Sequence, residues 1–412
     1  MSAGELTFGP RILELADRLA VHSELTGALA CTYLTPAHRA TANELAQWMR
    51  DAGMAVEIDG VANVVGRYAA AAGPAAARTL LVGSHYDTVV DAGKYDGRLG
   101  ILTGLVVIEH LNRTGRRLPF AIELIAFSEE EGLRYSASYI GSTAVAGSFD
   151  RSLLARRDEA GVSLAEAIAK SGFDPDAISS LARRREDLAG YLEVHIEQGP
   201  VLLQEGLPLG VVTAIAGGCR FVVTVTGEAG HAGTVPMGLR HDAAAAAAEI
   251  VLAVERRCTG VATLVGTVGK LQVPGGATNV IPGRCELSLD IRAADDATRD
   301  AAVADARAEI VAIAQRRGVT IDVRETQRTG AVACSPRVQA LFAQALGRLG
   351  VKPRFLPSGA GHDAVSFGPI TETGMLFVRC GNGGVSHSPR ESITAEDADL
   401  GARVLLDVLE AY

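Results

Sequence analysis

An apolar run that ends in two polar motifs constrains this chain more than any other stretch. Residues 79–82 predict a short buried strand, and the motif GSHYDT follows it directly. The motif GKYDG comes next, and residues 99–111 then predict a helix. His85, Asp87 and Asp96 are therefore expected where a strand ends and a helix begins, which is where open α/β sheets bind ligands.

The side chains at this strand end are ones that bind divalent cations. Imidazole nitrogens and carboxylate oxygens suit a borderline metal such as zinc or manganese, and one carboxylate can bridge two ions because it has two oxygens. Three adjacent carboxylates, Glu129, Glu130 and Glu131, follow the next predicted strand at 122–127, and a nearby cation would relieve their repulsion. The alternative for both stretches is a loop whose polar side chains simply face water.

Composition argues against several classes of protein. The net charge is −9 and Lys and Arg form no long cluster, so a nucleic-acid partner is not expected. No apolar stretch reaches the roughly 18 residues of a membrane-spanning helix, and Met1–Glu5 lack the basic and apolar regions of a signal peptide. The six cysteines are scattered without a C-x-x-C pair, as in reduced cytosolic proteins. We therefore expect a cytoplasmic protein that does not contact a membrane.

The order of the predicted elements divides the chain of 412 residues into two domains. Strands first alternate with helices, which predicts an α/β domain with a mostly parallel sheet flanked by helices. From 214 to 330, alternating strands and two helical stretches predict an inserted α+β domain. Residues 1–213 and 331–412 would then form one discontinuous domain. Two further predictions are a continuous helix over 153–170 and a continuous strand over 261–273.

Nine motifs occur in order along nearly the whole chain: SHYDT, GKYDG, EEEGLRY, EVHIEQGP, GHAGTVPM, TNVIPG, LDIRA, SGAGHDA and HSPRE. Together they resemble the amidase branch of the M20 metallopeptidase-like family. This hydantoinase/carbamoylase branch contains N-carbamoyl-L-amino acid hydrolases, β-ureidopropionases and allantoate amidohydrolases. The resemblance implies a zinc-exopeptidase-like catalytic domain and a ferredoxin-like insert that acts as a lid and dimerises. It also implies two divalent metal ions per subunit, and zinc, manganese, cobalt and nickel suit the ligands about equally well.

The resemblance assigns the metal ligands motif by motif. His85 and His195 would hold the first metal. Glu131 and His387 would hold the second, and Asp96 would bridge the two.

Catalytic roles follow from the same resemblance. Glu130 would be the general base, which takes a proton from water and returns it to the leaving nitrogen. Asp87 would orient the ring of His85. His231, in the insert, would reach the active site of the partner subunit in a homodimer and stabilise the oxyanion that develops there. Glu129 is a neighbour of these groups with no assigned role.

The substrate contacts are implied by four further motifs. Arg292 would clamp the substrate carboxylate through a bidentate pair, although it could instead pair with Asp290 or Glu286 on the same sheet. Asn279 could alternatively be a turn residue, and Gln198 could merely satisfy backbone groups. The residues implied as substrate contacts or pocket lining, besides Arg292 and His231, are Gln198, Asn279, Gly359 and His362.

The expected substrate is a small ureido acid. The segments around GKYDG and SGAGHDA resemble allantoate amidohydrolases more than N-carbamoyl-L-amino acid hydrolases. The expected reaction is therefore allantoate plus water to ureidoglycine, ammonia and carbon dioxide. Hydrolysis of an N-carbamoyl-L-amino acid or of N-carbamoyl-β-alanine is the alternative, and peptidase activity comes third. A non-catalytic binding protein would require loss of the base or of a ligand, and all of those positions are filled.

Overall fold

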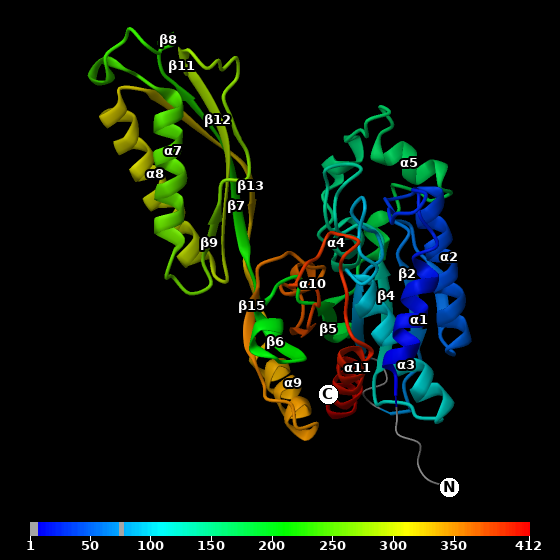
Figure 1. Ribbon diagram of the computed structural model, residues 1–412. Helices are drawn as coiled ribbons and strands as arrows, with labels where there is room; N and C mark the ends of the chain where they lie inside the picture. The colour runs from blue at the N-terminus through cyan, green and yellow to red at the C-terminus, as the bar shows by residue number, and fades with distance from the viewer. Residues whose placement is uncertain (1–6, 74–77) are drawn as a thin grey trace. The chain divides into compact units, whose positions relative to one another are not determined.

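The computed structural model describes residues 7–73 and 78–412 (Figure 1). The expectation that Met1–Glu5 carry no signal peptide lies outside these residues. The chain forms two compact units. Both ends of the sequence contribute to the first unit, and the middle of the sequence forms most of the second. Unit 1 comprises the chain up to Thr213, Cys334–Leu356 and His362–Tyr412, and unit 2 comprises Ala214–Ala333 and Pro357–Gly361.

Unit 1 is built on a mixed sheet whose strands follow the order β1-β2-β4-β3-β5-β16-β6, with β15 paired to β6. The central strands β4, β3, β5 and β16 are parallel, and antiparallel pairs lie on both sides of them. The α/β class with a mostly parallel centre is thus confirmed. These strands are β1 (Ala55–Ile58), β2 (Val64–Tyr68), β3 (Thr79–His85), β4 (Ala121–Phe127), β5 (Leu188–Ile196), β6 (Leu209–Ile215), β15 (Phe355–Ser358) and β16 (Thr373–Val378).

Helices cover both faces of this sheet, which is why its central strands are almost wholly buried. On one face α3 packs on β3, β4 and β5, while α9 and α11 pack on β16. On the other face α10 packs on β5 and β16, where the Phe367 ring stacks on Tyr191 with centroids 4.3 Å apart. No helix within the described residues has the length and apolar character needed to cross a membrane. The helices of unit 1 are α1 (Gly9–Leu19), α2 (Pro36–Asp51), α3 (Arg98–Arg113), α4 (Ile140–Ala146), α5 (Leu164–Lys170), α6 (Val201–Glu205), α9 (Pro336–Arg348), α10 (Ala364–Phe367) and α11 (Ala395–Ala411).

Unit 2 packs two helices on one face of an antiparallel sheet (Figure 1). The strand order is β10-β12-β7-β13, and β9 also pairs with β12. Alternate residues of β7 and β12 are buried, as expected when only one sheet face is covered. A separate two-stranded ladder joins β8 to β11. The elements are β7 (Gly217–Thr226), β8 (Gly230–His231), α7 (Ala243–Cys258), β9 (Val265–Thr267), β10 (Leu271–Gln272), β11 (Val280–Ile281), β12 (Arg284–Ala293), α8 (Asp296–Arg317), β13 (Thr320–Thr329) and β14 (Val332–Ala333).

The predicted continuous helix over 153–170 is wrong. A 3-10 turn ends at Ala155, and α5 begins only at Leu164. The intervening chain turns because the Asp158 carboxylate accepts the N–H groups of Ala160 and Val162. A capping box then starts α5, in which Ser163 and Glu166 satisfy each other's backbone N–H groups. Local side-chain hydrogen bonds therefore override the apolar spacing that favoured a helix.

The predicted continuous strand over 261–273 is also wrong. It consists of two short strands, β9 and β10, that both pair with β12. Thr267 lies opposite Asp290, and Leu271 lies opposite Leu287. Between these two pairs, the segment advances four residues while β12 advances three. The extra residue interrupts the ladder, as a bulge does.

Candidate active site

Strands β3 and β5 place His85 and His195 side by side at their carboxyl ends. Leu81 pairs with Tyr191 in parallel register, and each histidine lies four residues further along its strand. Because side chains alternate between the faces of a sheet, residues four apart project from the same face. The two buried rings are therefore neighbours, with centroids 5.8 Å apart.

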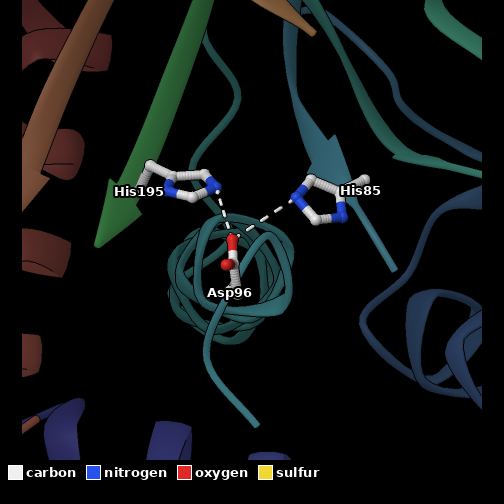
Figure 2. Close-up of side chains that lie close together, drawn as sticks. All are labelled: His85, Asp96 and His195. Atoms are coloured by element: carbon white, nitrogen blue, oxygen red, sulfur yellow. Dashed lines mark ion pairs between the residues drawn. The ribbon is translucent and has the colours of Figure 1, made fainter. Parts of the chain in front are cut away.

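Asp96 lies between these rings, shortly before α3 begins. Its Oδ1 is 3.6 Å from His85 Nε2 and 3.3 Å from His195 Nε2, and Figure 2 shows both rings directed at that carboxylate. Gly97 permits this approach, since its φ is +64° and a Cβ there would lie 2.5 Å from the His85 ring. The Gly97 N–H also donates to His195 Nε2 at 3.2 Å.

The other oxygen of Asp96 faces the remaining two predicted ligands. His387 Nε2 lies 3.2 Å from Asp96 Oδ2 and 3.3 Å from Glu131 Oε1. Asp96, Glu131 and His387 form one group whose candidate ligand atoms lie within 4.8 Å of one another. His85, Asp96 and His195 form a second such group. The structure thus brings together all five residues that the motifs assigned as ligands. Two sets of nitrogen and carboxylate donors that share one carboxylate fit two divalent ions of the zinc or manganese type.

Asp87 joins the loop after β3 to the loop after β4. Its Oδ1 and Oδ2 accept the backbone N–H groups of Glu130 and Glu131, each at 3.1 Å. Its Oδ1 also lies 3.3 Å from His85 Nδ1. Asp87 therefore contacts the ring that it was predicted to orient. It also holds the glutamate loop, a role that the sequence did not reveal because the bonded groups are 43 and 44 residues away.

Glu130 is buried next to His85 and Glu131, with which it forms a further candidate metal-binding group. Burial raises the pKa of Glu130 well above its usual range, although the positive charge of His85 opposes this. A raised carboxyl pKa suits a group that must accept and release a proton near neutral pH. Burial and the neighbouring Asp87 also raise the pKa of Glu129. Glu129 belongs to no candidate metal-binding group among the described residues.

The three histidines assigned as metal ligands, His85, His195 and His387, differ in how readily they take up a proton. Burial lowers the pKa of His195 to about 4. Hydrogen bonds with Asp96 and Glu131 raise the pKa of His387 to about 10. Burial also disfavours a charge on His85, but its two carboxylate neighbours outweigh burial and raise its pKa well above the usual range. Because a metal binds the neutral imidazole, cation binding at this cluster would release protons.

Gln198 and His362 also reach this cluster. Gln198 Nε2 donates to Asp96 Oδ2 at 2.9 Å, so its amide contacts a predicted ligand. The buried His362 ring lies edge-on to His195 with centroids 4.4 Å apart. Burial lowers the pKa of His362 well below its usual range. Both residues therefore lie where a bound substrate could meet them beside the predicted metals.

Two buried carboxyl groups near the histidines were missed by the sequence interpretation. Glu193 on β5 accepts hydrogen bonds from Ser84 Oγ at 2.9 Å and from the Tyr191 hydroxyl at 3.0 Å. Asp363 is fully buried. Burial raises the pKa of Glu193 to about 8 and that of Asp363 to about 7. Both residues lie in motifs whose histidines were assigned roles, Glu193 in EVHIEQGP and Asp363 in SGAGHDA. This proximity in sequence could have indicated them.

His231 and Asn279 lie together at one end of unit 2. His231 pairs with Val280 in the β8–β11 ladder, and the Asn279 carbonyl accepts the Ala232 N–H at 3.0 Å. Both residues are exposed. Two predicted substrate contacts from separate motifs thus share one small surface.

Arg292 lies in the larger sheet of unit 2, which is separate from the β8–β11 ladder, and close to where β7 begins. Its guanidinium forms a bidentate pair with Asp290 at 3.0 and 2.9 Å and donates to the Gly359 carbonyl at 2.9 Å. One of the two alternative partners, Asp290, is therefore a neighbour in the structure. The other, Glu286, pairs with Arg284 instead.

Relatives of known activity match nearly the whole chain. It is 41% identical to an N-carbamoyl-L-amino acid amidohydrolase of Geobacillus stearothermophilus, over 96% of this chain and 95% of the relative. It is 39% identical to allantoate deiminase 2 of Glycine max, over 94% of this chain and 86% of the relative. An amidase of the hydantoinase/carbamoylase family from Burkholderia multivorans has a similar structure, with a TM-score of 0.91, 32% identity and coverage of 98% and 97% of the two chains.

The pattern described as peptidase family M20/M25/M40 matches residues 81–411. This span contains all nine motifs, so the resemblance drawn from them is confirmed. The chain therefore belongs to the metal-dependent peptidase family M20/M25/M40, as a hydrolase of its hydantoinase/carbamoylase amidase branch.

Proposed function

We propose that this protein is a two-metal amidohydrolase that cleaves a ureido C–N bond of allantoate. The observation that carries the proposal is the Asp96 carboxylate, which faces two histidines with one oxygen and a histidine next to a glutamate with the other. His85 and His195 would hold one ion, and Glu131 and His387 the other. When bound, the ions would polarise the ureido carbonyl and make a water molecule more acidic.

Glu130 would move the proton in this reaction. It would accept a proton from the attacking water and deliver it to the leaving nitrogen. Its buried position beside His85 supports this, because burial raises the pKa of Glu130 and so makes its carboxylate a better acceptor of a proton from water. The products are ureidoglycine and a carbamate that breaks down to ammonia and carbon dioxide.

Unit 2 would supply the groups that hold the substrate. Arg292, whose guanidinium is oriented by Asp290, would bind the substrate carboxylate. His231 would donate to the oxyanion, with Asn279 beside it. Gly359, whose carbonyl meets Arg292, would line the same pocket.

The distance within unit 2 supports a homodimer. Arg284 and Arg292 are eight positions apart on β12, which is about 26 Å of strand. The β8–β11 ladder that carries His231 lies beyond the Arg284 end (Figure 1). Arg292 and His231 of one subunit therefore cannot meet the same small molecule. We propose that His231 and Asn279 act on the partner subunit's site, with unit 2 as lid and dimerisation domain. The six free, buried cysteines suit a cytoplasmic enzyme.

An N-carbamoyl-L-amino acid is the second candidate substrate, since a relative of that activity is 41% identical. Both substrates are ureido acids and release ammonia. The test is ammonia release from a panel of allantoate, ureidoglycolate, N-carbamoyl-β-alanine and several N-carbamoyl-L-amino acids. We expect the highest kcat/KM for allantoate. A higher value for an N-carbamoyl-L-amino acid would establish the second candidate, and no release from any of them would refute ureido hydrolysis.

Metal content should approach two ions per chain. The shared Asp96 and the two donor sets around it are the reason. Protein reconstituted with excess zinc or manganese and then freed of unbound metal can be measured by elemental analysis. Metal-free protein with full activity in the presence of a chelator would refute the two-metal proposal.

Arg292→Lys should raise the KM for allantoate much more than it lowers kcat. Lysine keeps the charge but lacks the planar fork that pairs with both Asp290 and a carboxylate. Arg324→Lys, an exposed position on β13 of the same sheet, is the matched control. Unchanged KM in Arg292→Lys for every carboxylate substrate would show that Arg292 only stabilises the sheet.

A further inference from the structure

Glu391, in the HSPRE motif, connects two distant parts of the candidate metal centre. It is buried, and its Oε1 accepts the backbone N–H groups of Tyr95 at 2.8 Å and Asp96 at 3.1 Å. One carboxylate oxygen therefore fixes the backbone of the residue that faces all three ligand histidines.

The second oxygen of Glu391 reaches the segment that carries His387. Ser386 Oγ lies 3.2 Å from Glu391 Oε2 and 2.7 Å from Asp96 Oδ2. Ser386 directly precedes His387 in the chain. Glu391 thus contacts both loops that meet at Asp96 Oδ2, although almost 300 residues of chain separate them.

Gly93 is shaped to receive this side chain. A Cβ at Gly93 would lie 2.3 Å from the Glu391 Cβ and 2.4 Å from its carboxyl carbon. The φ of Gly93 is not positive, so the requirement is for space rather than for backbone freedom. The first glycine of GKYDG and the glutamate of HSPRE are therefore complementary parts of one contact.

We propose that Glu391 is a positioning residue, which holds the loops of Asp96 and His387 in the arrangement that binds the second metal. The inference rests on the proposed two-metal function. Glu391 itself touches neither substrate nor metal in this scheme, and it acts through the hydrogen bonds to Asp96 and Ser386. Partners of metal ligands commonly change affinity by about 10- to 100-fold when they are removed.

The probe is Co²⁺ titrated into metal-depleted protein, because its visible absorption reports on the ligands that surround it. Glu391→Ala should weaken the binding of one of the two Co²⁺ ions by about 10- to 100-fold and change its spectrum. The effect on the other ion should be smaller, because its ligands His85 and His195 are held by β3 and β5. Glu391→Gln should restore tight binding. Its amide oxygen can accept the two N–H groups, and its NH₂ group can donate to Ser386 Oγ.

Asp399→Ala is the matched control, since Asp399 also accepts two consecutive backbone N–H groups, those of Phe8 and Gly9. It contacts none of the predicted ligands, so it should lower thermal stability and leave both Co²⁺ ions unaffected. Gly93→Ala should weaken the same ion as Glu391→Ala. Its effect should shrink in the Gly93→Ala/Glu391→Gly double variant, because residue 391 then has no Cβ to clash with the new methyl group.

Measurements on the wild-type protein distinguish failure of the proposed two-metal function from failure of the proposed role of Glu391. Fewer than two Co²⁺ ions bound by wild type would refute the proposed function. Two tight ions in wild type and two equally tight ions with an unchanged spectrum in Glu391→Ala would overturn the role of Glu391. If Glu391→Ala does not fold, a Co²⁺ affinity and spectrum unchanged by Gly93→Ala would overturn it as well.

Discussion

Glu130→Gln should lower kcat at least about a hundredfold, the contribution expected of a general base. The amide keeps the size of the side chain and its place beside His85 and Glu131, but it cannot accept the proton of water. The metal ligands are untouched, and the Glu130 N–H can still donate to Asp87. We therefore expect unchanged metal content and a largely unchanged KM. Single-turnover ammonia release together with elemental analysis would measure both.

Glu129→Gln is the control for this substitution. Glu129 is the adjacent buried carboxyl, and its pKa is likewise raised by burial. A smaller loss of kcat in Glu129→Gln than in Glu130→Gln would assign the base to Glu130. The reverse order would move the proton-transfer role to Glu129.

Two inactive variants should complement each other in a mixed dimer. His231→Ala and Glu130→Gln are each expected to be nearly inactive. If His231 acts on the partner subunit's site, a mixed dimer has one site with both defects and one site with neither. Activity should then approach about a quarter of wild type when half of the dimers are mixed. The measurement is ammonia release after the two variants are unfolded and refolded together.

Controls decide what this experiment means. Each variant refolded alone must stay inactive, and differently tagged subunits must show that mixed dimers have formed. Mixed dimers without recovered activity would place His231 at its own subunit's site or outside catalysis. A protein that stays monomeric at assay concentrations, with His231→Ala still inactive, would contradict the proposed dimer as well.

Periodicity was a reliable guide where burial is regular. The strands β3, β4 and β5 are apolar runs because helices cover both of their faces, and such runs are visible in one dimension. Periodicity failed over 153–170 and 261–273. In the first, the Asp158 side chain bonds nearby N–H groups and turns the chain before α5 begins. In the second, one extra residue relative to β12 divides the strand.

The amino-acid sequence by itself determined the family, the sheet and the strand-end positions of the candidate ligands. Parallel strands end at the same edge of a sheet, so residues such as His85 and His195 must meet there once the strand order is set. Only the tertiary structure decided which side chains hold those groups in place. Asp87 bonds the Glu130 loop, and Glu391 fits against Gly93. Hydrogen-bond geometry is short-ranged and directional, so partners far apart in sequence become visible only when the chain is folded.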